Sequence, residues 1–526
     1  MKTTSLWGTG CCTWMTVKSS ATGFGGRAEM GYDVGLAISD LRAEKLLDGA
    51  LLPGPAGAEY YPADELAGRE VAGAFAGAGL DSRRLAPGAL FVALAGQNVD
   101  GRCFVPAVLE AGHWVLTRSA AAPDPLVGAS LRDGGGALLS PDPEKALAHL
   151  AGCWRRRLGT RVLGITGTNG KTTTKDLARA LLSGGGKTQA TRGNFNNQLG
   201  LPITLLDLRP ETRFAVIEMG ASAVGDIRYL ARIARPDVGL ITNASPAHME
   251  KFGSLENIIA GKGELLAELP ATGRAILNAD SPGFAQWSRR SVCAVCSWGR
   301  ETGDHRWSFD AAAGALILDG EAWPVPLPGA HNAANLCAAI LAARAFGLED
   351  AALRAGLEGF VPSDHRSRLL RWRGRTVLDD SYNANPGSVR AAARTVADMA
   401  AAGRAFAVLG PMAELGPTGD ALHRETGAAL ADLGPDSLDP DSLDPDSLGL
   451  AGLLAVGDGT GERAARELAA GFGRGAEVRA SCAQALIWLR EHTTAGDIIL
   501  VKGSRSAGMD RLVRLMEAEA EEDENP

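Results

Sequence analysis

The pattern with the plainest chemistry is a glycine-rich turn at residues 166–173, which read ThrGlyThrAsnGlyLysThrThr. A buried strand is predicted before the turn and a helix after it, which is the context of a phosphate-binding loop. Backbone amides of such a turn point at phosphates. Lys171 would neutralise the β- and γ-phosphates of ATP, and the hydroxyl of Thr172 or Thr173 would reach Mg²⁺. The predicted nucleotide-binding residues are Gly167, Thr168, Asn169, Gly170, Lys171, Thr172 and Thr173.

This loop departs from the strict GxxxxGK[ST] pattern, because Ile165 stands where the first glycine would be. For a bare GlyLysThr tripeptide, an exposed lysine on a turn is the usual interpretation. The preceding strand, the two glycines and the three consecutive threonines favour nucleotide binding instead.

Polar residues that follow two other predicted strands are candidate magnesium ligands. Glu218 ends the run PheAlaValIleGlu at 214–218, and His248 follows the run ValGlyLeuIleThrAsn at 238–243. Mg²⁺ on ATP keeps several waters and needs few carboxylates, and Glu218 suits that role. His248 is a less usual ligand, and a hydrogen-bonded loop residue is the plainer interpretation. Lys262, by its spacing alone, is predicted to be a surface lysine of a helix.

A pair of asparagines supplies a further candidate for nucleotide binding. Asn332 and Asn335 are three residues apart and therefore share one face of a predicted helix. Amide side chains can read the edge of an adenine. Helix capping is the alternative, and the spacing alone leaves both open.

Parallel sheets would bring these groups together. Short β-branched runs alternate with longer Ala- and Leu-rich stretches, as is typical of βα units. Ligands of an open parallel sheet bind beyond the carboxyl ends of its strands. The runs of the central region are 161–166, 214–218 and 238–243, and those of a second doubly wound sheet are 376–380, 405–410, 453–457 and 497–502.

The sequence predicts an α/β protein of three domains. We expect a small α/β domain, a central ATP-binding domain with a parallel sheet, and a C-terminal Rossmann-like doubly wound domain. An acidic, proline-containing pentad repeat at 435–448 is predicted to be a solvated loop. The predicted parts are a leader of unknown role at 1–60, the first domain at 61–155, the central domain at 156–360, the C-terminal domain at 361–520 and an acidic tail at 521–526.

The bulk composition gives no support for two classes of partner. The chain has 526 residues, of which 45% are hydrophobic, and a formal net charge of -8. This balance gives no reason to expect binding to nucleic acid or insertion into a membrane. The eight scattered cysteines indicate reduced thiols, and Cys293 and Cys296 have no second pair at zinc-ligand spacing. We therefore expect a cytoplasmic protein.

Three motifs in this order resemble the Mur ligases, a family of ATP-dependent amide ligases. They are ThrGlyThrAsnGlyLysThr at 166–172, LeuAsnAlaAsp at 277–280 and GlyAlaHisAsnAlaAlaAsn at 329–335. The resemblance implies that Asn278 and His331 bind the nucleotide and that His248 lies at a second metal. It also implies that Lys262 is carbamylated, because a carbamate is an anion that can lie beside Mg²⁺.

The reaction that this resemblance implies needs positioning and cations rather than a protein nucleophile. The acid would accept the γ-phosphoryl group of ATP, and an amine would displace phosphate from the acyl phosphate. Arg368 matches the family's arginine at the start of the third domain and would contact the phosphates on domain closure. A simple surface arginine is the alternative. The predicted catalytic residues are Lys171, Lys262, Arg368 and Asp380.

Other motifs resemble the members of the family that join D-alanyl-D-alanine to a UDP-linked muramoyl tripeptide. AspSerArg at 81–83 and AspGlyArgCysPhe at 100–104 resemble the UDP-muramoyl-binding domain. The stretches at 193–202, 382–388 and 501–505 favour the ligases that add the dipeptide. The predicted substrate-binding residues are Asp81, Ser82, Arg83, Asp100, Asn194, Asn197, Tyr382, Asn383, Asn385 and Lys502.

Two rival functions stay open from the sequence. One is another amide ligase of the same superfamily, which would add a single amino acid or a glutamate. The other is a nucleotide-dependent binding protein that ligates nothing. Pro411 departs from the family pattern, which commonly has Asp at that position. The resemblance predicts a monomer that uses ATP and Mg²⁺, and the sequence does not reveal the third residue of the tripeptide.

Overall fold

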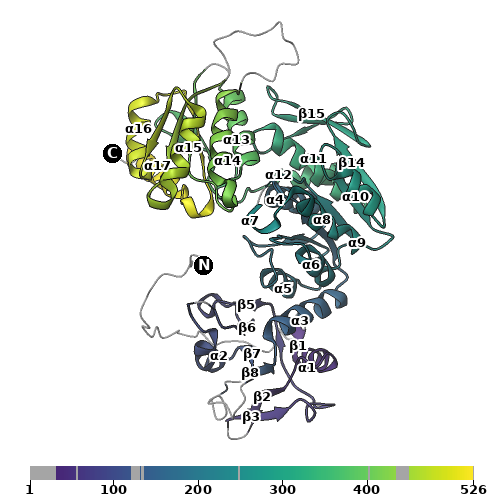
Figure 1. The fold of residues 1–526 in the computed structure, drawn as a ribbon. Coiled ribbons are helices and arrows are strands. Elements are labelled where there is room, and N and C mark those ends of the chain that lie inside the picture. The colour runs from purple at the N-terminus through teal and green to yellow at the C-terminus, as the bar shows by residue number, and fades with distance from the viewer. Residues whose placement is uncertain are drawn as a thin grey trace. The chain divides into compact units, whose positions relative to one another are not determined.

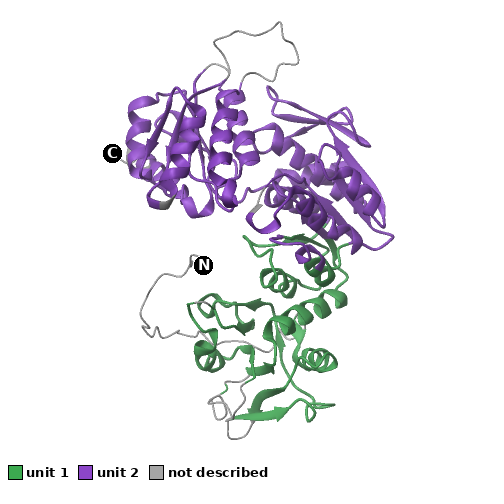
Figure 2. Cartoon of the chain, in the orientation of Figure 1, with its two compact units in different colours: residues 1–162, 186–219, 229–236 green, residues 163–185, 220–228, 237–526 purple. Residues whose placement is uncertain are grey.

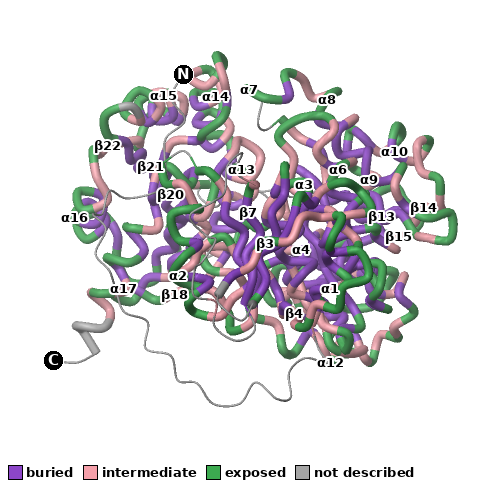
Figure 3. Tube along the Cα trace, turned by 90° about the horizontal axis from the view of Figure 1, so that it is seen from below, coloured by how far each residue is buried: buried purple, intermediate pink, exposed green. Residues whose placement is uncertain are grey.

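The computed structural model describes residues 31–54, 57–96, 98–119, 131, 135–246, 249–400, 403–433 and 449–524. Figure 1 labels the helices and strands. The chain divides into two compact units (Figure 2), which are residues 1–162, 186–219 and 229–236 for unit 1 and residues 163–185, 220–228 and 237–526 for unit 2. Buried residues follow the strands, whereas exposed residues lie on the outer helices and loops (Figure 3).

A six-stranded sheet forms the centre of unit 1. Its order is β3-β2-β8-β7-β6-β5, in which β5 to β8 are parallel and β2 is antiparallel to both neighbours. Leu51, Phe91 and Val115 lie in its core. The strands are β2 (Gly49–Gly54), β3 (Gly57–Pro62), β5 (Ala78–Gly79), β6 (Leu90–Ala93), β7 (Trp114–Arg118) and β8 (Gly136–Ser140).

Part of the predicted leader belongs to this fold. β1 (Tyr32–Asp33) pairs with β4 (Ala74–Phe75), and α1 (Val34–Ala43) is capped by the carboxylate of Asp33. Strand β2 and most of β3 also precede residue 61. The prediction of a leader is therefore wrong for residues 32–60. These elements are short, and β1 and β2 pair with distant strands, so their local sequence carried little periodic signal.

The remaining elements of unit 1 include a segment that we predicted in the central domain. Helix α5 packs on α3, and the Arg209 guanidinium donates a hydrogen bond to the Ala76 carbonyl at 2.8 Å. Residues 186–219 therefore cluster with unit 1. The elements are α2 (Val105–Glu110), α3 (Pro143–Arg157), α5 (Gly200–Leu206) and the parallel pair β10 (Thr188–Ala190) and β11 (Phe214–Glu218).

The first sheet of unit 2 contains the strand that leads into the glycine-rich turn. Its strands run in the order β9-β12-β13-β14-β15-β16-β17, parallel from β9 to β15 and antiparallel thereafter. Helix α11 packs against α4. The strands are β9 (Arg161–Thr166), β12 (Val238–Ile241), β13 (Arg274–Asn278), β14 (Ala294–Gly299), β15 (His305–Asp310), β16 (Ala315–Leu318) and β17 (Glu321–Pro324).

Among the residues that the structure describes, seven helices belong to the same part of unit 2 as this sheet. They are α4 (Lys171–Ser183), α7 (Met249–Phe252), α8 (Leu255–Lys262), α9 (Glu264–Ala267), α10 (Phe284–Arg290), α11 (Ala330–Ala345) and α12 (Asp350–Glu358). A further helix, α6 (Asp226–Ala234), has residues in both units.

The second sheet of unit 2 has the order β18-β19-β23-β20-β21-β22, parallel except for β18. Its continuous apolar runs are buried on both faces, as expected for a doubly wound sheet. The strands are β18 (Arg368–Trp372), β19 (Arg375–Asp380), β20 (Ala405–Leu409), β21 (Leu450–Val456), β22 (Ala476–Arg479) and β23 (Ile498–Lys502), and the helices are α13 (Pro386–Met399), α14 (Gly419–Ala431), α15 (Glu462–Phe472), α16 (Cys482–His492) and α17 (Asp510–Glu524).

The structure describes one of the two low-complexity segments in part and the other not at all. The pentad repeat at 435–448 lies outside the described residues. The acidic tail predicted from residue 521 is partly helical, because α17 continues to Glu524. In the described part of the chain, no helix has the length and apolar character needed to cross a membrane.

Candidate active site

The glycine-rich turn lies between β9 and α4 and is fastened to the end of β12. Gly170 has φ 79 and is the N-cap residue of α4, so that the amides of the first helical turn face the loop. Thr168 N donates to the Asn243 carbonyl at 2.9 Å, and Asn169 N donates to Asn243 Oδ1 at 3.0 Å. Thr242 Oγ1 donates to the Asn169 carbonyl at 2.6 Å. We call residues 166–173 the phosphate loop.

Lys171 and Lys262 bring positive charge to this loop. Lys171 Nζ donates to the carbonyls of Gly167 at 2.8 Å and Thr168 at 2.9 Å. Lys262 ends α8 and is 3% exposed, so the prediction of a surface lysine is wrong. Burial, and then the charge of Lys171, hold the pKa of Lys262 well below its usual value. An anion beside the two ammonium groups would relieve this repulsion, and the site therefore fits a polyphosphate.

Asn332 and Asn335 lie on α11 beneath the loop. Asn335 Oδ1 accepts from Thr174 Oγ1 at 3.3 Å, and Asn335 Nδ2 donates to Asn332 Oδ1 at 3.2 Å. Asn332 Nδ2 donates to the Pro328 carbonyl at 2.8 Å. Both asparagines are buried, and their side-chain amides form hydrogen bonds with protein groups. In this geometry the two amides support the loop, and binding of the nucleotide by Asn332 and Asn335 stays a prediction.

We expect Gly170→Ala to weaken nucleotide binding about tenfold and to lower the free energy of unfolding by about 1–3 kcal/mol. An added Cβ would lie 2.3 Å from Asn335 Oδ1, on a backbone with φ 79. Gly347→Ala is the matched control, because Gly347 has φ 80 and nothing lies within 4 Å of its added Cβ. Urea unfolding and calorimetric titration with a non-hydrolysable ATP analogue compare the two variants. Equal nucleotide affinities in both would contradict this role of the loop geometry.

The other predicted nucleotide residues of unit 2 flank the loop. Thr172 is buried and Thr173 is half-buried in the first turn of α4. Asn278 is the last residue of β13, and its Nδ2 donates to the Thr242 carbonyl at 2.9 Å. Asn278 therefore contacts the strand end that holds the phosphate loop.

Asn385 links the second sheet of unit 2 to the phosphate loop. It caps α13, because Asn385 Oδ1 accepts from Ser388 N at 2.9 Å and Ser388 Oγ accepts from Asn385 N at 3.0 Å. Its Nδ2 donates to Asn169 Oδ1 at 2.6 Å, and Asn169 Nδ2 donates to Ser245 Oγ at 3.3 Å. The positive end of the α13 dipole thus lies beside the phosphate loop.

Lys502 joins three segments at the same edge of the second sheet. It ends β23, is 3% exposed and forms an ion pair with Asp380. Its Nζ also donates to the Asn383 carbonyl at 2.8 Å, and Asp380 Oδ1 accepts from Ser367 N at 3.1 Å. The structure therefore brings together three residues that we predicted separately.

His331 faces the second sheet from the first turn of α11. Its Nδ1 lies 3.4 Å from Thr395 Oγ1 of α13. Burial lowers the pKa of His331 to about 4. The negative charge of Asp380 opposes this shift, and the positive charge of Lys502 adds a smaller lowering. The imidazole is therefore neutral at neutral pH, so that it offers hydrogen bonds without charge.

Arg368 forms an ion pair with the C-terminal helix α17. Its guanidinium forms an ion pair with Glu517 of α17 at 2.9 Å, and its side chain is 41% exposed. The surface-arginine alternative describes this arrangement. Contact between Arg368 and the phosphates stays a prediction for a closed state of the domains.

Unit 1 holds the predicted residues around Glu218. Glu218 ends β11 and is buried, and its Oε1 accepts from Asn196 Nδ2 at 2.8 Å. The Asn194 carbonyl accepts from Asn196 N, and Asn197 Oδ1 accepts from Gly200 N at the start of α5. Our sequence interpretation missed Asn196. The signal was present, because Asn196 lies between two asparagines that we had selected.

Two Asp-x-Arg pairs repeat one geometry in unit 1. The Asp81 carboxylate accepts from Arg83 Nε at 2.8 Å, across the intervening Ser82, and the Asp100 carboxylate accepts from Arg102 Nη2 at 2.6 Å. These hydrogen bonds hold the pKa of both carboxyls below the usual range. Because the pairs follow the parallel neighbours β5 and β6, both lie beyond one edge of the sheet.

The predicted metal ligands are only partly described. His248 lies outside the described residues. Among the residues that are described, no three His, Cys, Asp or Glu side chains gather as a metal site. Mg²⁺ carried by ATP takes phosphate and water oxygens and needs few protein ligands. Thr172 and Glu218 therefore stay predicted ligands, and Cys293 and Cys296 are free thiols.

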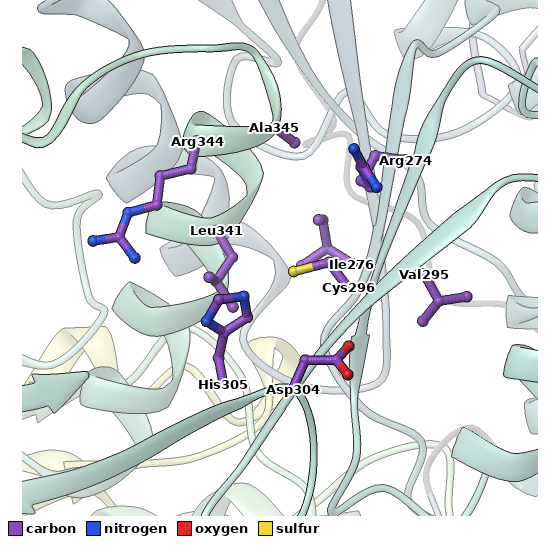
Figure 4. A pocket seen from close by; sticks show the side chains of 9 residues that line it. All are labelled: Arg274, Ile276, Val295, Cys296, Asp304, His305, Leu341, Arg344 and Ala345. Carbon is purple, nitrogen blue, oxygen red and sulfur yellow. The ribbon is translucent and has the colours of Figure 1, made fainter. Parts of the chain in front are cut away.

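A cavity of about 370 Å³ lies at the other edge of the first sheet (Figure 4). Its lining includes Arg274 at the amino end of β13, Cys296 in β14 and Arg344 near the end of α11. The phosphate loop follows the carboxyl end of β9 and contacts α11 near its beginning. The cavity therefore lies apart from the candidate active site.

Comparison with known proteins supplies the family. Residues 165–343 match the Mur ligase middle domain, and residues 365–505 match the Mur ligase, glutamate ligase domain. A UDP-N-acetylmuramoyl-tripeptide--D-alanyl-D-alanine ligase of Synechocystis is 39% identical over 68% of this chain and 77% of its own length. The ligase of the same name from Escherichia coli is 34% identical over 83% of this chain and 92% of its own length.

Solved structures agree with these relatives. A MurF from Acinetobacter baumannii aligns with a TM-score of 0.71 at 30% identity, over 84% of this chain and 93% of its own. The MurF ligase from Thermotoga maritima in complex with ADP aligns with a TM-score of 0.70 at 25% identity, over 85% of this chain and 98% of its own. The chain contains both Mur ligase domains and covers most of the length of these relatives. It therefore belongs to the Mur ligase family, among its D-alanyl-D-alanine-adding members.

Proposed function

We propose that this chain joins D-alanyl-D-alanine to UDP-N-acetylmuramoyl-tripeptide, with conversion of ATP to ADP and phosphate. The product would be the UDP-muramoyl-pentapeptide precursor of peptidoglycan. The observation that carries the proposal is the hydrogen bond between Asn169 of the phosphate loop and Asn385 of α13, at 2.6 Å. It joins the functional edges of two sheets, one suited to ATP and the other available to an acceptor.

The first chemical step transfers the γ-phosphoryl group. An oxygen of the terminal tripeptide carboxylate attacks the γ-phosphorus, the bond to the bridging oxygen breaks, and ADP leaves with that electron pair. Lys171 and the amides at the start of α4 bind the phosphates and offset their charge. Mg²⁺, when bound, neutralises phosphate oxygens, and Thr172 and Glu218 are its predicted protein ligands.

The second step forms the amide. The dipeptide amine attacks the acyl carbon, the carbon–oxygen bond to phosphate breaks, and the nitrogen gives up one proton. The negative charge of the tetrahedral intermediate would develop near the phosphate loop. The positive end of the α13 dipole, fixed there by Asn385, would stabilise that charge.

We also propose a cytoplasmic monomer that takes small-molecule substrates. A nucleotide-linked substrate and ATP are both cytoplasmic metabolites, and the free cysteines agree with a reducing compartment. Size-exclusion chromatography with light scattering tests the monomer, and a mass near 54.5 kDa is the expected result.

Phosphate release from ATP tests the proposed reaction directly. The assay contains Mg²⁺ and UDP-muramoyl-tripeptide, with or without D-alanyl-D-alanine, followed by mass analysis of the product. Dipeptide-dependent release with a pentapeptide product supports the proposal. Release that requires a single amino acid would favour an amino-acid-adding ligase. Turnover that no acceptor changes would favour the nucleotide-dependent binding protein.

Asn385→Ser is expected to lower kcat about tenfold while changing the free energy of unfolding by less than about 0.5 kcal/mol. Serine caps a helix as well as asparagine does, but its side chain is too short to reach Asn169. The variant therefore keeps the cap of α13 and loses the bond to the phosphate loop. Ser388→Ala is the matched control, because it disturbs the capping box without touching Asn169. A similar fall in kcat for both variants would contradict a role for the bond.

A further inference from the structure

Two arginine guanidinium groups contact the aromatic ring of Tyr382 at the edge of the second sheet. The Arg366 guanidinium carbon lies 4.0 Å from the ring centroid, and that of Arg505 lies 5.5 Å from it. Both distances are within the range of a cation–π contact, which is about 6 Å. Arg366 precedes β18, and Arg505 follows β23, so the ring gathers two cations from distant parts of the chain.

These two cations have no counter-charge among the described residues. Neither Arg366 nor Arg505 forms an ion pair with a described carboxylate. Other arginines of this sheet do, such as Arg368 with Glu517. Arg366 is half-buried and Arg505 is exposed, so both remain open to a ligand from solvent.

The backbone around Arg366 is held in an unusual conformation. His365 has φ 60 and Ser367 has φ 50, and neither is glycine. A non-glycine residue in this region is strained and persists only when its surroundings fix it. His365 Nδ1 bonds to the buried carboxylate of Asp379 at 2.8 Å, and Tyr382 N donates to the His365 carbonyl at 3.1 Å. Arg366 and the ring are thus fixed to one another.

The segment that carries Arg505 is also held in place, by a hydrogen bond and an ion pair. Ser504 N donates to the Pro411 carbonyl at 3.0 Å, and Lys502 is bonded to Asp380. The departure of Pro411 from the family pattern therefore leaves its carbonyl in use as a support. This edge of the sheet is the one that reaches the phosphate loop through Asn385.

We propose that Arg366 and Arg505, held on Tyr382, bind the terminal carboxylate of D-alanyl-D-alanine. This inference rests on the proposed function and names the acceptor's binding group. Guanidinium forks match a carboxylate with paired hydrogen bonds, and a carboxylate would supply the missing counter-charge. The nucleophilic nitrogen of a dipeptide lies about 7 Å from its carboxylate in an extended chain. A single amino acid spans only about half of that length, so a carboxylate site at these arginines would distinguish a dipeptide from a single amino acid.

The test compares D-alanyl-D-alanine with its C-terminal amide as acceptors for the full chain. The wild-type chain is expected to prefer the acid by on the order of 10²-fold in kcat/KM, because the amide leaves two guanidinium groups unpaired. Arg505→Gln and Arg366→Gln are each expected to reduce that preference about tenfold, through the KM of the dipeptide. The KM of ATP and that of UDP-muramoyl-tripeptide are expected to stay within about twofold.

Three further variants separate binding from structure. Arg474→Gln removes an exposed arginine of the same sheet, before β22, and should keep the full preference. Arg505→Lys keeps the charge without the fork and should fall between the wild type and Arg505→Gln. Tyr382→Leu should reduce the preference in the same direction. Thermal unfolding midpoints of all variants identify any that fail to fold.

Two results would overturn the inference while the proposed function stands. One is a wild-type chain that accepts acid and amide equally well. The other is a rise in the KM of UDP-muramoyl-tripeptide instead of the dipeptide, which would assign the arginines to that substrate. A wild-type chain with no dipeptide-dependent ligation at all would overturn the proposed function itself.

Discussion

Lys171→Met is expected to lower dipeptide-dependent ligation about 10³-fold and to leave the fold unchanged. Removal of one donor aimed at developing charge usually lowers kcat by about 10²- to 10³-fold, and Lys171 would also be lost from ground-state phosphate binding. The loop itself is held by Asn243 and Thr242, so its conformation does not depend on the lysine alone. Rates of phosphate release, ADP affinity and the thermal unfolding midpoint measure the three effects.

Lys187→Met is the control for this loss. Lys187 forms an ion pair with Glu211 and is 54% exposed. Its removal should change the ligation rate by less than about twofold, because exposed ion pairs contribute little. A Lys171→Met variant that ligated at the parent rate would remove the basis for the phosphate role.

The phosphate loop could be predicted from the sequence because its chemistry is contiguous. Eight neighbouring residues, a strand before them and a helix after them specify both the turn and its ligand. The bond from Asn385 to Asn169 could not be predicted in that way. The two residues are 216 positions apart, and the helix cap at Asn385 was already a sufficient local explanation.

The direction in which a helix face points was the harder problem. The spacing of Asn332 and Asn335 correctly placed them on one face of α11. The sequence also indicated that this face is buried, because α11 is apolar on nearly all sides and such a helix lies in the interior. The spacing alone also suggested a surface position for Lys262, whereas α8 carries it into the interior. Burial of a polar residue depends on packing partners that no local window contains.

Lys262→Met is expected to stabilise the fold and to inactivate the ligase. In buffer free of carbon dioxide, the variant should be more stable near neutral pH by on the order of 1–3 kcal/mol, because it removes a buried amine whose charged form is disfavoured by burial. Lys262 is 3% exposed, and no described carboxylate forms an ion pair with it. Methionine has nearly the same length and keeps the contact with Phe252. Urea unfolding of both chains measures the difference.

The stability difference should depend on pH with a definite sign. Burial lowers the pKa of Lys262 in the folded chain below its ordinary value of 10.5. Between these two pKa values the unfolded chain binds more protons than the folded chain, so wild-type stability rises with pH. The advantage of Lys262→Met should therefore be largest below the folded pKa and vanish as the pH approaches 10.5. An advantage that grew with pH would contradict the lowered pKa.

The same lowered pKa prepares Lys262 to become an anion. Only a neutral amine reacts with carbon dioxide, forming a nitrogen–carbon bond and releasing one proton, and a lowered pKa increases the neutral fraction. The carbamate would reverse the charge beside Lys171 and could accept a hydrogen bond or approach Mg²⁺. We expect a ¹³C carbamate signal in wild-type protein supplied with labelled bicarbonate, and none in Lys262→Met. Ligation by the variant should fall at least about 10²-fold at any bicarbonate concentration, whereas wild-type activity should rise with bicarbonate. Full activity of Lys262→Met would show that the buried amine serves packing alone.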